Sequence, residues 1–182
     1  DGRFVTFESV ASGLVSGDTN GMRDIFVRDR RTGTTYLVSK DSAGIIGNGD
    51  SSTPIISANG RYVAFESAAT SLVAGDTNGL NDIFVRDRQT GVTERVNVSS
   101  SGAQANGDSW VGSISADGRY VAFGSRATNL VPGDTNGPAN DWQGADVFVH
   151  DRQTGVTERV SVSSSGAQAN GPSWGGDISA DG

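Results

Sequence analysis

The stretch "DIFVRDRQTGVTERV" at residues 82–96 decides the fold, because close copies of it stand at residues 24–38 and 146–160. Each copy consists of a short apolar run, a turn that ends in Thr-Gly, and a second short run rich in β-branched residues. This order is typical of two antiparallel strands joined by a tight turn. Sustained helical spacing of apolar residues is absent from every window of the sequence.

The copies belong to a longer repeat that is fixed by the turns "DGR" and "NGR". Gly2, Gly60, Gly118 and Gly182 are equivalent, which gives spacings of 58, 58 and 64 residues. The six extra residues lie in the third copy, where "GDTNGPANDWQGAD" replaces "GDTNGLND". We therefore predict one array of three repeat units, residues 2–59, 60–117 and 118–181.

Each unit contains four strand candidates. One set consists of "IIS" at 55–57, just before the turn that starts the second unit, and of "RYVAFES" at 61–67, "DIFVRD" at 82–87 and "VTERVNVS" at 92–99 within that unit. The second candidate should place Val63 and Phe65 on one face, with Tyr62 and Ala64 on the other. Four short antiparallel strands at a fixed period predict an all-β fold made of three β-propeller blades.

The motifs "SADGRYVAF" at 115–123 and "DIFVRDRQTGVTERV" resemble the TolB-type, WD40-like β-propeller repeat of bacteria. The similarity covers nearly the whole chain, although Ala58, Ala116 and Ala180 stand where that family usually has Pro. It implies a propeller fold and a bacterial secreted, periplasmic or cell-surface protein. It says little about function, because this fold serves binding, scaffolding and enzyme-appended roles alike.

Composition narrows the function classes. The net charge of −7 disfavours a nucleic-acid or anionic-membrane partner, and no apolar run is long enough for membrane insertion. The absence of cysteine excludes disulfides and thiolate chemistry. Catalytic motifs such as Gly-x-Ser-x-Gly or His-Glu-x-x-His are also missing, so we predict a protein that is not an enzyme.

The number of repeats predicts self-association. Closed propellers typically use about four to eight blades, and an open blade edge invites pairing. The chain opens at the second strand of one unit and stops after the first strand of another. We expect a homodimer with a six-bladed ring, strand exchange between chains, or a piece of a larger propeller.

The pentapeptide "GDTNG" begins at residues 17, 75 and 133 and suggests a calcium loop. Calcium binds six to eight oxygens, and Asp-x-Asn-Gly followed by a further Asp supplies oxygens at alternate loop positions. The alternative is a tight turn in which Asp and Asn cap backbone groups. In the third unit the insertion leaves either Asp146 or Asp141 as the last ligand. The predicted metal ligands are Asp18, Asn20, Asp24, Asp76, Asn78, Asp82, Asp134, Asn136 and Asp146.

A second long loop, "GAQANGDSW" in the second unit, should emerge on the same face as "GDTNG". A Trp beside amides and a carboxylate can stack on a sugar ring and bond its hydroxyls, although the Trp side chains could instead fill space between blades. Trp142, in the insertion, is the better candidate for an exposed aromatic. The predicted ligand-binding residues are Gln104, Asn106, Asp108, Trp110, Trp142, Gln168, Asn170 and Trp174.

The recurring Arg and Asp residues at 28–30, 86–88 and 151–152 suggest ion pairs between blades rather than a substrate clamp. From these observations we predict a non-enzymatic propeller module that acts as a binding or structural scaffold with a protein or glycan ligand and calcium-stabilised loops. A carbohydrate-binding, lectin-like propeller is the first alternative. The propeller domain of a polysaccharide-degrading enzyme is the second.

Overall fold

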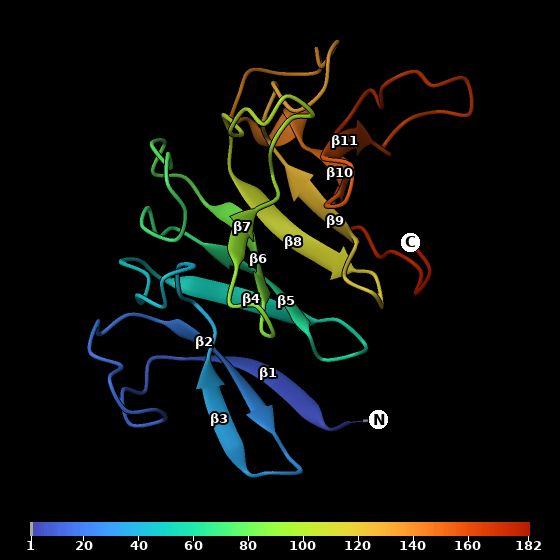
Figure 1. Ribbon diagram of the computed structural model, residues 1–182. Helices are drawn as coiled ribbons and strands as arrows, with labels where there is room; N and C mark the ends of the chain where they lie inside the picture. Colours follow the sequence, from blue (N-terminus) through green and yellow to red (C-terminus); the bar gives the residue numbers. More distant parts are fainter. Residues whose placement is uncertain (1) are drawn as a thin grey trace.

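A computed structural model, which describes residues 2–182, shows three separate antiparallel sheets that lie side by side as in a fan (Figure 1). The strand orders are β1-β2-β3 in the first sheet, β4-β5-β6-β7 in the second and β8-β9-β10-β11 in the third. Within residues 2–182 the only helical element is the short 3-10 turn η1 (Trp142–Gly144), and no helix has the length and hydropathy to cross a bilayer. The strands are β1 (Phe4–Ser9), β2 (Asp24–Asp29), β3 (Thr34–Leu37), β4 (Ser51–Ile56), β5 (Tyr62–Ser67), β6 (Asp82–Asp87), β7 (Thr93–Arg95), β8 (Ser109–Ile114), β9 (Tyr120–Ser125), β10 (Asp146–Asp151) and β11 (Val156–Arg159).

The two motifs that define the repeat form the central strand pair of every sheet. In the second sheet β5 and β6 pair antiparallel with Phe65 opposite Phe84, and the ring centroids are 5.9 Å apart. The equivalent pairs in the first and third sheets have the same register and centroid distances of 5.7 Å. Phe26, Phe84 and Phe148 are fully buried. The second and third strands of each unit therefore pair antiparallel, as expected for a propeller blade.

The core lies between neighbouring sheets, because each strand contributes alternate residues to its two faces. Val63 and Phe65 pack with residues of the first sheet, including Ile25 and Val27. Ala64 packs with residues of the third sheet. The alternation predicted for this strand is thus confirmed, and it buries the second sheet on both faces.

The first strand of a sheet is longer than predicted. β4 begins at Ser51 rather than residue 55, because a β-bulge between Ser52 and Ile55 lets the chain continue pairing with β5. Thr53 lies in this bulge with a φ of 51°, and its backbone N–H donates to the Glu8 carboxylate of the first sheet at 2.8 Å. The same contact joins Val111 to Glu66 one sheet further along, so a glutamate connects each pair of sheets.

The "NG" and "DG" turns also hold the sheets together. A Cβ on Gly118 would lie 2.0 Å from the ring of Tyr62, so this turn needs glycine both for its φ of +78° and for close approach. The Tyr62 ring is in turn covered by the guanidinium groups of Arg61 and Arg152, at 4.9 and 4.5 Å. Aromatic rings between arginines are thus part of the contact between sheets.

Candidate functional site

The two loops singled out in the sequence meet in each repeat. The Asn20 amide donates to the Gly47 carbonyl at 3.1 Å, and Asn78 donates to the Ala105 carbonyl at 2.8 Å. In the third repeat the backbone N–H of Thr135 donates to the Gln168 amide oxygen at 3.1 Å. The structure therefore brings the "GDTNG" loop against the loop that follows the fourth strand.

The Asn-Gly part of these loops follows turn chemistry. The amide oxygen of Asn78 accepts the backbone N–H of Leu80 at 3.0 Å, and Asn20 binds Met22 in the same way. Gly79 has a φ of +64° with open space around it, so backbone conformation alone explains glycine there. The asparagine oxygens in these two loops are thus already used by the turn.

The aspartates of the second repeat form a buried carboxylate pair, and the positive charge beside it comes from an arginine side chain. Asp82 is fully buried, and its Oδ2 accepts Arg95 Nη1 at 3.1 Å and Gln104 Nε2 at 3.2 Å. The same two groups reach Asp76 Oδ1, at 3.6 Å from Arg95 and 2.9 Å from Gln104. The other oxygen of Asp82 accepts the Asn97 amide at 2.6 Å. Burial raises the pKa of Asp82, opposed by Asn97 and by Arg95.

The third repeat repeats this arrangement. Arg159 lies 3.4 Å from both Asp134 and Asp146, and the Gln168 amide donates to them at 2.8 and 3.0 Å. Asn136 donates to Asp146 at 3.1 Å. Of the two ligands left open by the sequence, Asp146 joins the pair. Asp141 instead caps η1.

The first repeat lacks both groups that compensate the pair. Leu37 stands opposite Phe26 in the register that Arg95 has opposite Phe84. Ile46 forms the isolated bridge that Gln104 forms in the second repeat. Asp24 is fully buried and its Oδ1 accepts the Ser39 hydroxyl at 2.5 Å, but its Oδ2 has no hydrogen-bond partner.

The environment of Asp24 disfavours its charge. Burial raises the pKa of Asp24, the carboxylates of Asp18 and Asp50 add to this, and the Ser39 hydroxyl and Asn20 amide act in the opposite direction. Asp18 is itself 8% exposed. Among residues 2–182, no group of three or more His, Cys, Asp or Glu side chains is placed to hold a metal, so any cation here would also need amide, carbonyl or water oxygens.

The second predicted site contains a stack of aromatic side chains. The Trp110 ring lies over Gly124, where a Cβ would be 2.2 Å from the indole. Trp142 packs on Trp110 at 5.7 Å between ring centroids, and the Arg126 guanidinium lies 4.2 Å from the Trp142 ring. Trp142 is nonetheless 55% exposed. The stack therefore holds one indole at the surface of the third repeat.

The other predicted ligand-binding residues divide into two groups. Asn106 and Asp108 are engaged within the fold: the Asn106 amide donates to Thr128, and Asp108 accepts Arg126 Nη2 at 2.6 Å. Asn170 is exposed and Trp174 is 61% exposed. Of these four residues, Asn170 and Trp174 could therefore contact a ligand without breaking side-chain contacts such as those of Asn106 and Asp108.

Sequence reasoning missed Arg95 and Arg159 as members of the loop clusters. Both lie on the fourth strand of their repeat, 13 residues after the aspartate that they bind. The signal that could have found them is the alignment of "VTERV" with "TTYLV", in which arginine is replaced by leucine only in the first repeat.

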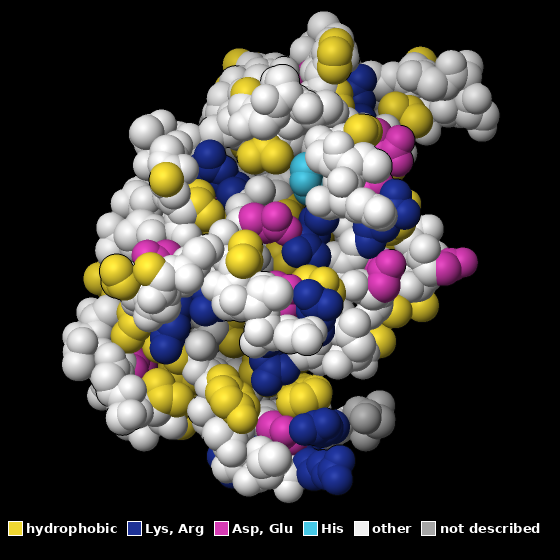
Figure 2. All heavy atoms as spheres, in the orientation of Figure 1, with side chains coloured by type: hydrophobic (Ala, Val, Ile, Leu, Met, Phe, Trp, Pro, Cys, Tyr) yellow, Lys and Arg dark blue, Asp and Glu magenta, His cyan; other side chains and the backbone are white. Residues whose placement is uncertain are grey.

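The recurring Arg and Asp residues were predicted to pair between blades, and for the aspartates this is wrong. Arg61 binds Asp87 within the second sheet at 2.6 Å, and Arg3 and Asp29 pair in the same way in the first. Arg152 does reach across, to Glu94 of the second sheet. Figure 2 shows basic, acidic and hydrophobic side chains interspersed over the face that it presents.

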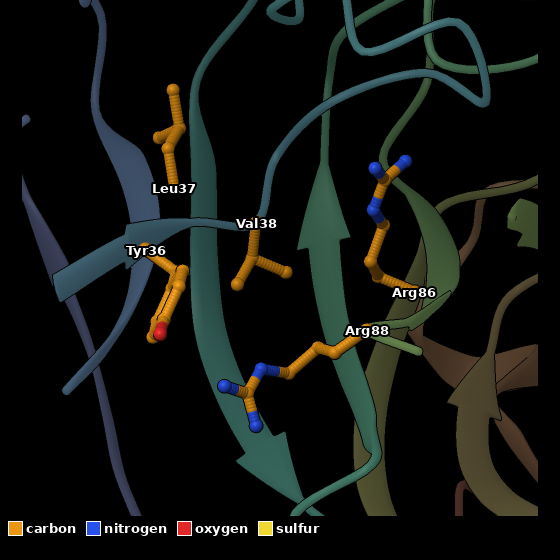
Figure 3. A pocket seen from close by; sticks show the side chains of 5 residues that line it. All are labelled: Tyr36, Leu37, Val38, Arg86 and Arg88. Carbon is orange, nitrogen blue, oxygen red and sulfur yellow. The ribbon is translucent and has the colours of Figure 1, made fainter. Parts of the chain in front are cut away.

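A groove of about 310 Å³ lies between the first and second sheets and is lined by Tyr36, Leu37, Val38, Arg86 and Arg88 (Figure 3). Its arginines are engaged by the fold. Arg86 Nη1 donates to the carbonyls of Lys40 and Asp41, and the Arg88 guanidinium lies 5.5 Å from the Tyr36 ring. The groove is therefore part of the contact between the first and second sheets, and its arginines contribute to that contact.

Solved structures resemble this fold although the sequence gives no match to a family model or to a curated protein. A putative TolB from Agrobacterium tumefaciens aligns with 87% of this chain at 19% identity and a TM-score of 0.52. TolB from Acinetobacter baumannii aligns with 99% of it at 20% identity and a TM-score of 0.51. This chain spans 45% and 33% of those chains, which is less than half their length. The protein therefore has an all-β, TolB-like propeller fold.

Proposed function

We propose that this chain is a non-enzymatic propeller module of a bacterial secreted, periplasmic or cell-surface protein, and that it binds a partner through the loops of its third repeat. The TolB-like fold supports a binding or scaffold role. The observation that carries the proposal is the indole of Trp142, which is 55% exposed in the one insertion that breaks the repeat.

An exposed indole on a supported platform has the properties of a binding anchor. Large aromatic side chains dominate the energetics of interfaces, and a side chain that is already ordered loses little entropy on binding. Trp142 contacts Trp110, at 5.7 Å between ring centroids, and the Arg126 guanidinium, at 4.2 Å from its ring. The partner that we propose is a protein that covers this indole.

A glycan is the second candidate ligand. Trp174 is also exposed, at 61%, and lies just before the C-terminal segment of the same repeat region. Exposed indoles suit sugar rings, whose apolar faces stack on aromatics.

The proposal includes two further elements. Strand β1 is the edge of its sheet, whereas its counterparts β5 and β9 pair with β4 and β8. We propose this edge for self-association or for the rest of a larger propeller. We also propose that calcium stabilises the "GDTNG" loops.

The test compares wild type with Trp142→Ala and with Tyr36→Ala, a control that removes a 45% exposed aromatic from the first sheet. Each protein is passed over immobilised β-1,4-glucan, chitin and polygalacturonate. In a separate experiment each protein is cross-linked in a periplasmic extract, and the proteins attached to it are identified by mass spectrometry. Loss of a central interface Trp typically costs 2 kcal/mol or more, which corresponds to roughly 30-fold weaker binding.

If wild type and Tyr36→Ala are retained on a polysaccharide and Trp142→Ala is not, the ligand is a glycan. If wild type and Tyr36→Ala cross-link to a protein and Trp142→Ala does not, the ligand is that protein. Binding that is equal in all three proteins, or absent from all, would overturn the proposal that this indole is the anchor.

A further inference from the structure

We infer that the Asp18–Asp24 pair of the first repeat is a calcium site, and that Arg95 and Arg159 occupy the place of this cation in the other two repeats. The inference rests on the calcium part of the proposed function and confines it to one loop. It is independent of the ligand that Trp142 meets.

The three repeats place the same oxygen atoms in the same positions. Oδ1 of the buried aspartate accepts a side chain from the segment after the fourth strand in every repeat, from Ser39, Asn97 or Ser161. Oδ2 accepts an arginine and a glutamine in the second and third repeats. By this equivalence Oδ2 of Asp24 faces the space that a guanidinium and an amide fill elsewhere.

The first repeat leaves this oxygen without a partner. Asp24 has no exposed surface, and Oδ2 accepts no hydrogen bond. A buried carboxylate oxygen without a partner costs free energy, and a second carboxylate beside it increases the cost. Leu37 and Ile46 cannot reduce that cost because neither carries a donor or a charge. A cation bound between Asp18 and Asp24 would supply what Arg95 supplies between Asp76 and Asp82.

The donor set favours calcium among common cations. Two carboxylates provide a double negative charge, which suits a divalent rather than a monovalent ion. The Asn20 oxygen is used by the turn, so the remaining ligands would be a loop carbonyl, such as that of Gly47, and water. Calcium accepts six to eight such oxygens in irregular geometry, whereas magnesium demands a near-ideal octahedron and keeps its water. The hard oxygen ligands and the two carboxylates therefore favour calcium over a monovalent ion or magnesium.

The test measures calcium binding to the full chain by isothermal titration and thermal midpoint by scanning calorimetry, first in chelator and then in calcium. Wild type should bind one calcium per chain, and the midpoint should rise with calcium concentration as mass action requires. Asp18→Asn should weaken binding at least tenfold. Asp76→Asn, the matched change in the second repeat, should still bind one calcium.

The decisive variant is Leu37→Arg, with Ile46→Gln and the double variant made in parallel in case the single arginine does not fold. Each variant gives the first repeat a side chain that compensates the aspartate pair in the second repeat. They should raise the midpoint in chelator and lose the response to calcium. Magnesium at the same concentration should shift the wild-type midpoint less than calcium does.

Three results would overturn the inference. One is a wild-type midpoint that does not respond to calcium. Another is a stoichiometry of three, which would assign calcium to every "GDTNG" loop. The last is calcium binding that survives Asp18→Asn or the Leu37→Arg and Ile46→Gln variants. A negative result here leaves the Trp142 experiment unaffected, because its readout is ligand capture.

Discussion

The first and second repeats differ at the point where their loops are held together. In the second, Arg95 lies within 3.1 and 3.6 Å of two buried carboxylates. In the first, Leu37 takes that position and Asp24 keeps an unpartnered oxygen. The strands around these positions pair in the same register in both sheets. One backbone pattern thus supports one cluster that contains its own compensating arginine and another that lacks such a group.

This comparison shows that sequence repetition does not imply equal chemistry. The pentapeptide "GDTNG" is identical in both repeats, yet its aspartate meets a cation in only one of them. The determinant lies on another strand. A motif in a repeat protein therefore has to be read together with the residues that its fold brings opposite to it.

The largest expected effect tests whether the two sheets are equally well buried. Phe84→Ala should cost about 3–5 kcal/mol in the free energy of unfolding, because the ring is fully buried in a sheet that is covered on both faces. Phe26→Ala should cost less, because that ring, although also fully buried, stacks on Phe7 within its own sheet and is not part of the core that the first and second sheets share. Urea denaturation of both variants measures the difference.

Val92→Ala provides the control, since that side chain is 48% exposed and its truncation should change stability by no more than about 0.5 kcal/mol. Equal losses for Phe26→Ala and Phe84→Ala would contradict this reason and show that both buried rings contribute equally to stability.

The next effect converts the second repeat into the first. Arg95→Leu leaves Asp76 and Asp82 buried without their cation, which should cost about 3 kcal/mol in chelator. Calcium should then restore part of the loss, because a ligand of the native state alone stabilises it. Arg95→Lys, which keeps the charge, should lose less. Urea denaturation with and without calcium checks both statements.

A cost below about 1 kcal/mol for Arg95→Leu would contradict the view that this arginine compensates a buried charge, since exposed ion pairs have values of that size. The first and second repeats would then differ in the size of the side chain at this position and not in the stability that its charge provides.

The smallest effect concerns a feature that the two repeats share. The Arg61 guanidinium lowers the pKa of Asp87, with the backbone N–H of Gln89 adding to it. A lowered pKa in the folded state contributes stability above the unfolded value of about 3.9, and this contribution is lost as the pH falls below it. Asp87→Asn should therefore flatten the acid limb of the stability curve.

Asp29→Asn should flatten that limb by a similar amount, because Arg3 lowers the pKa of Asp29 in the same way. Thermal midpoints measured between about pH 2 and 6 provide the test. An acid limb as steep in both variants as in wild type would show that these pairs do not contribute to acid unfolding.

The central strands could be predicted from the sequence because alternation and repetition act locally. Val63, Ala64 and Phe65 point where a period of two places them, and the phenylalanines of the paired strands meet in all three sheets. The start of β4 could not be predicted, because the backbone N–H of Thr53 in the bulge donates to the carboxylate of Glu8, 45 residues earlier in the chain. The contact recurs between Val111 and Glu66, but no alternation of apolar and polar residues marks it in the sequence.

The site was predictable in part for the same reason. The meeting of the two loops followed from strand order, and Asn78 and Gln104 lie where these loops meet. Arg95 was not found, because an arginine on a strand near a turn is usually a solvated side chain, and only its neighbours in three dimensions identify its partner.

The Trp110 indole over Gly124 has a consequence for how such arrays diversify. In the preceding repeat the paired positions hold Ser52 and Glu66, a small residue opposite a large one, whereas here the large residue has changed sides. A unit that donated only one half of this pair to its neighbour would bring either two bulky groups or none to the same spot. Recombination between these copies therefore preserves this packing only when the crossover carries both halves of the pair.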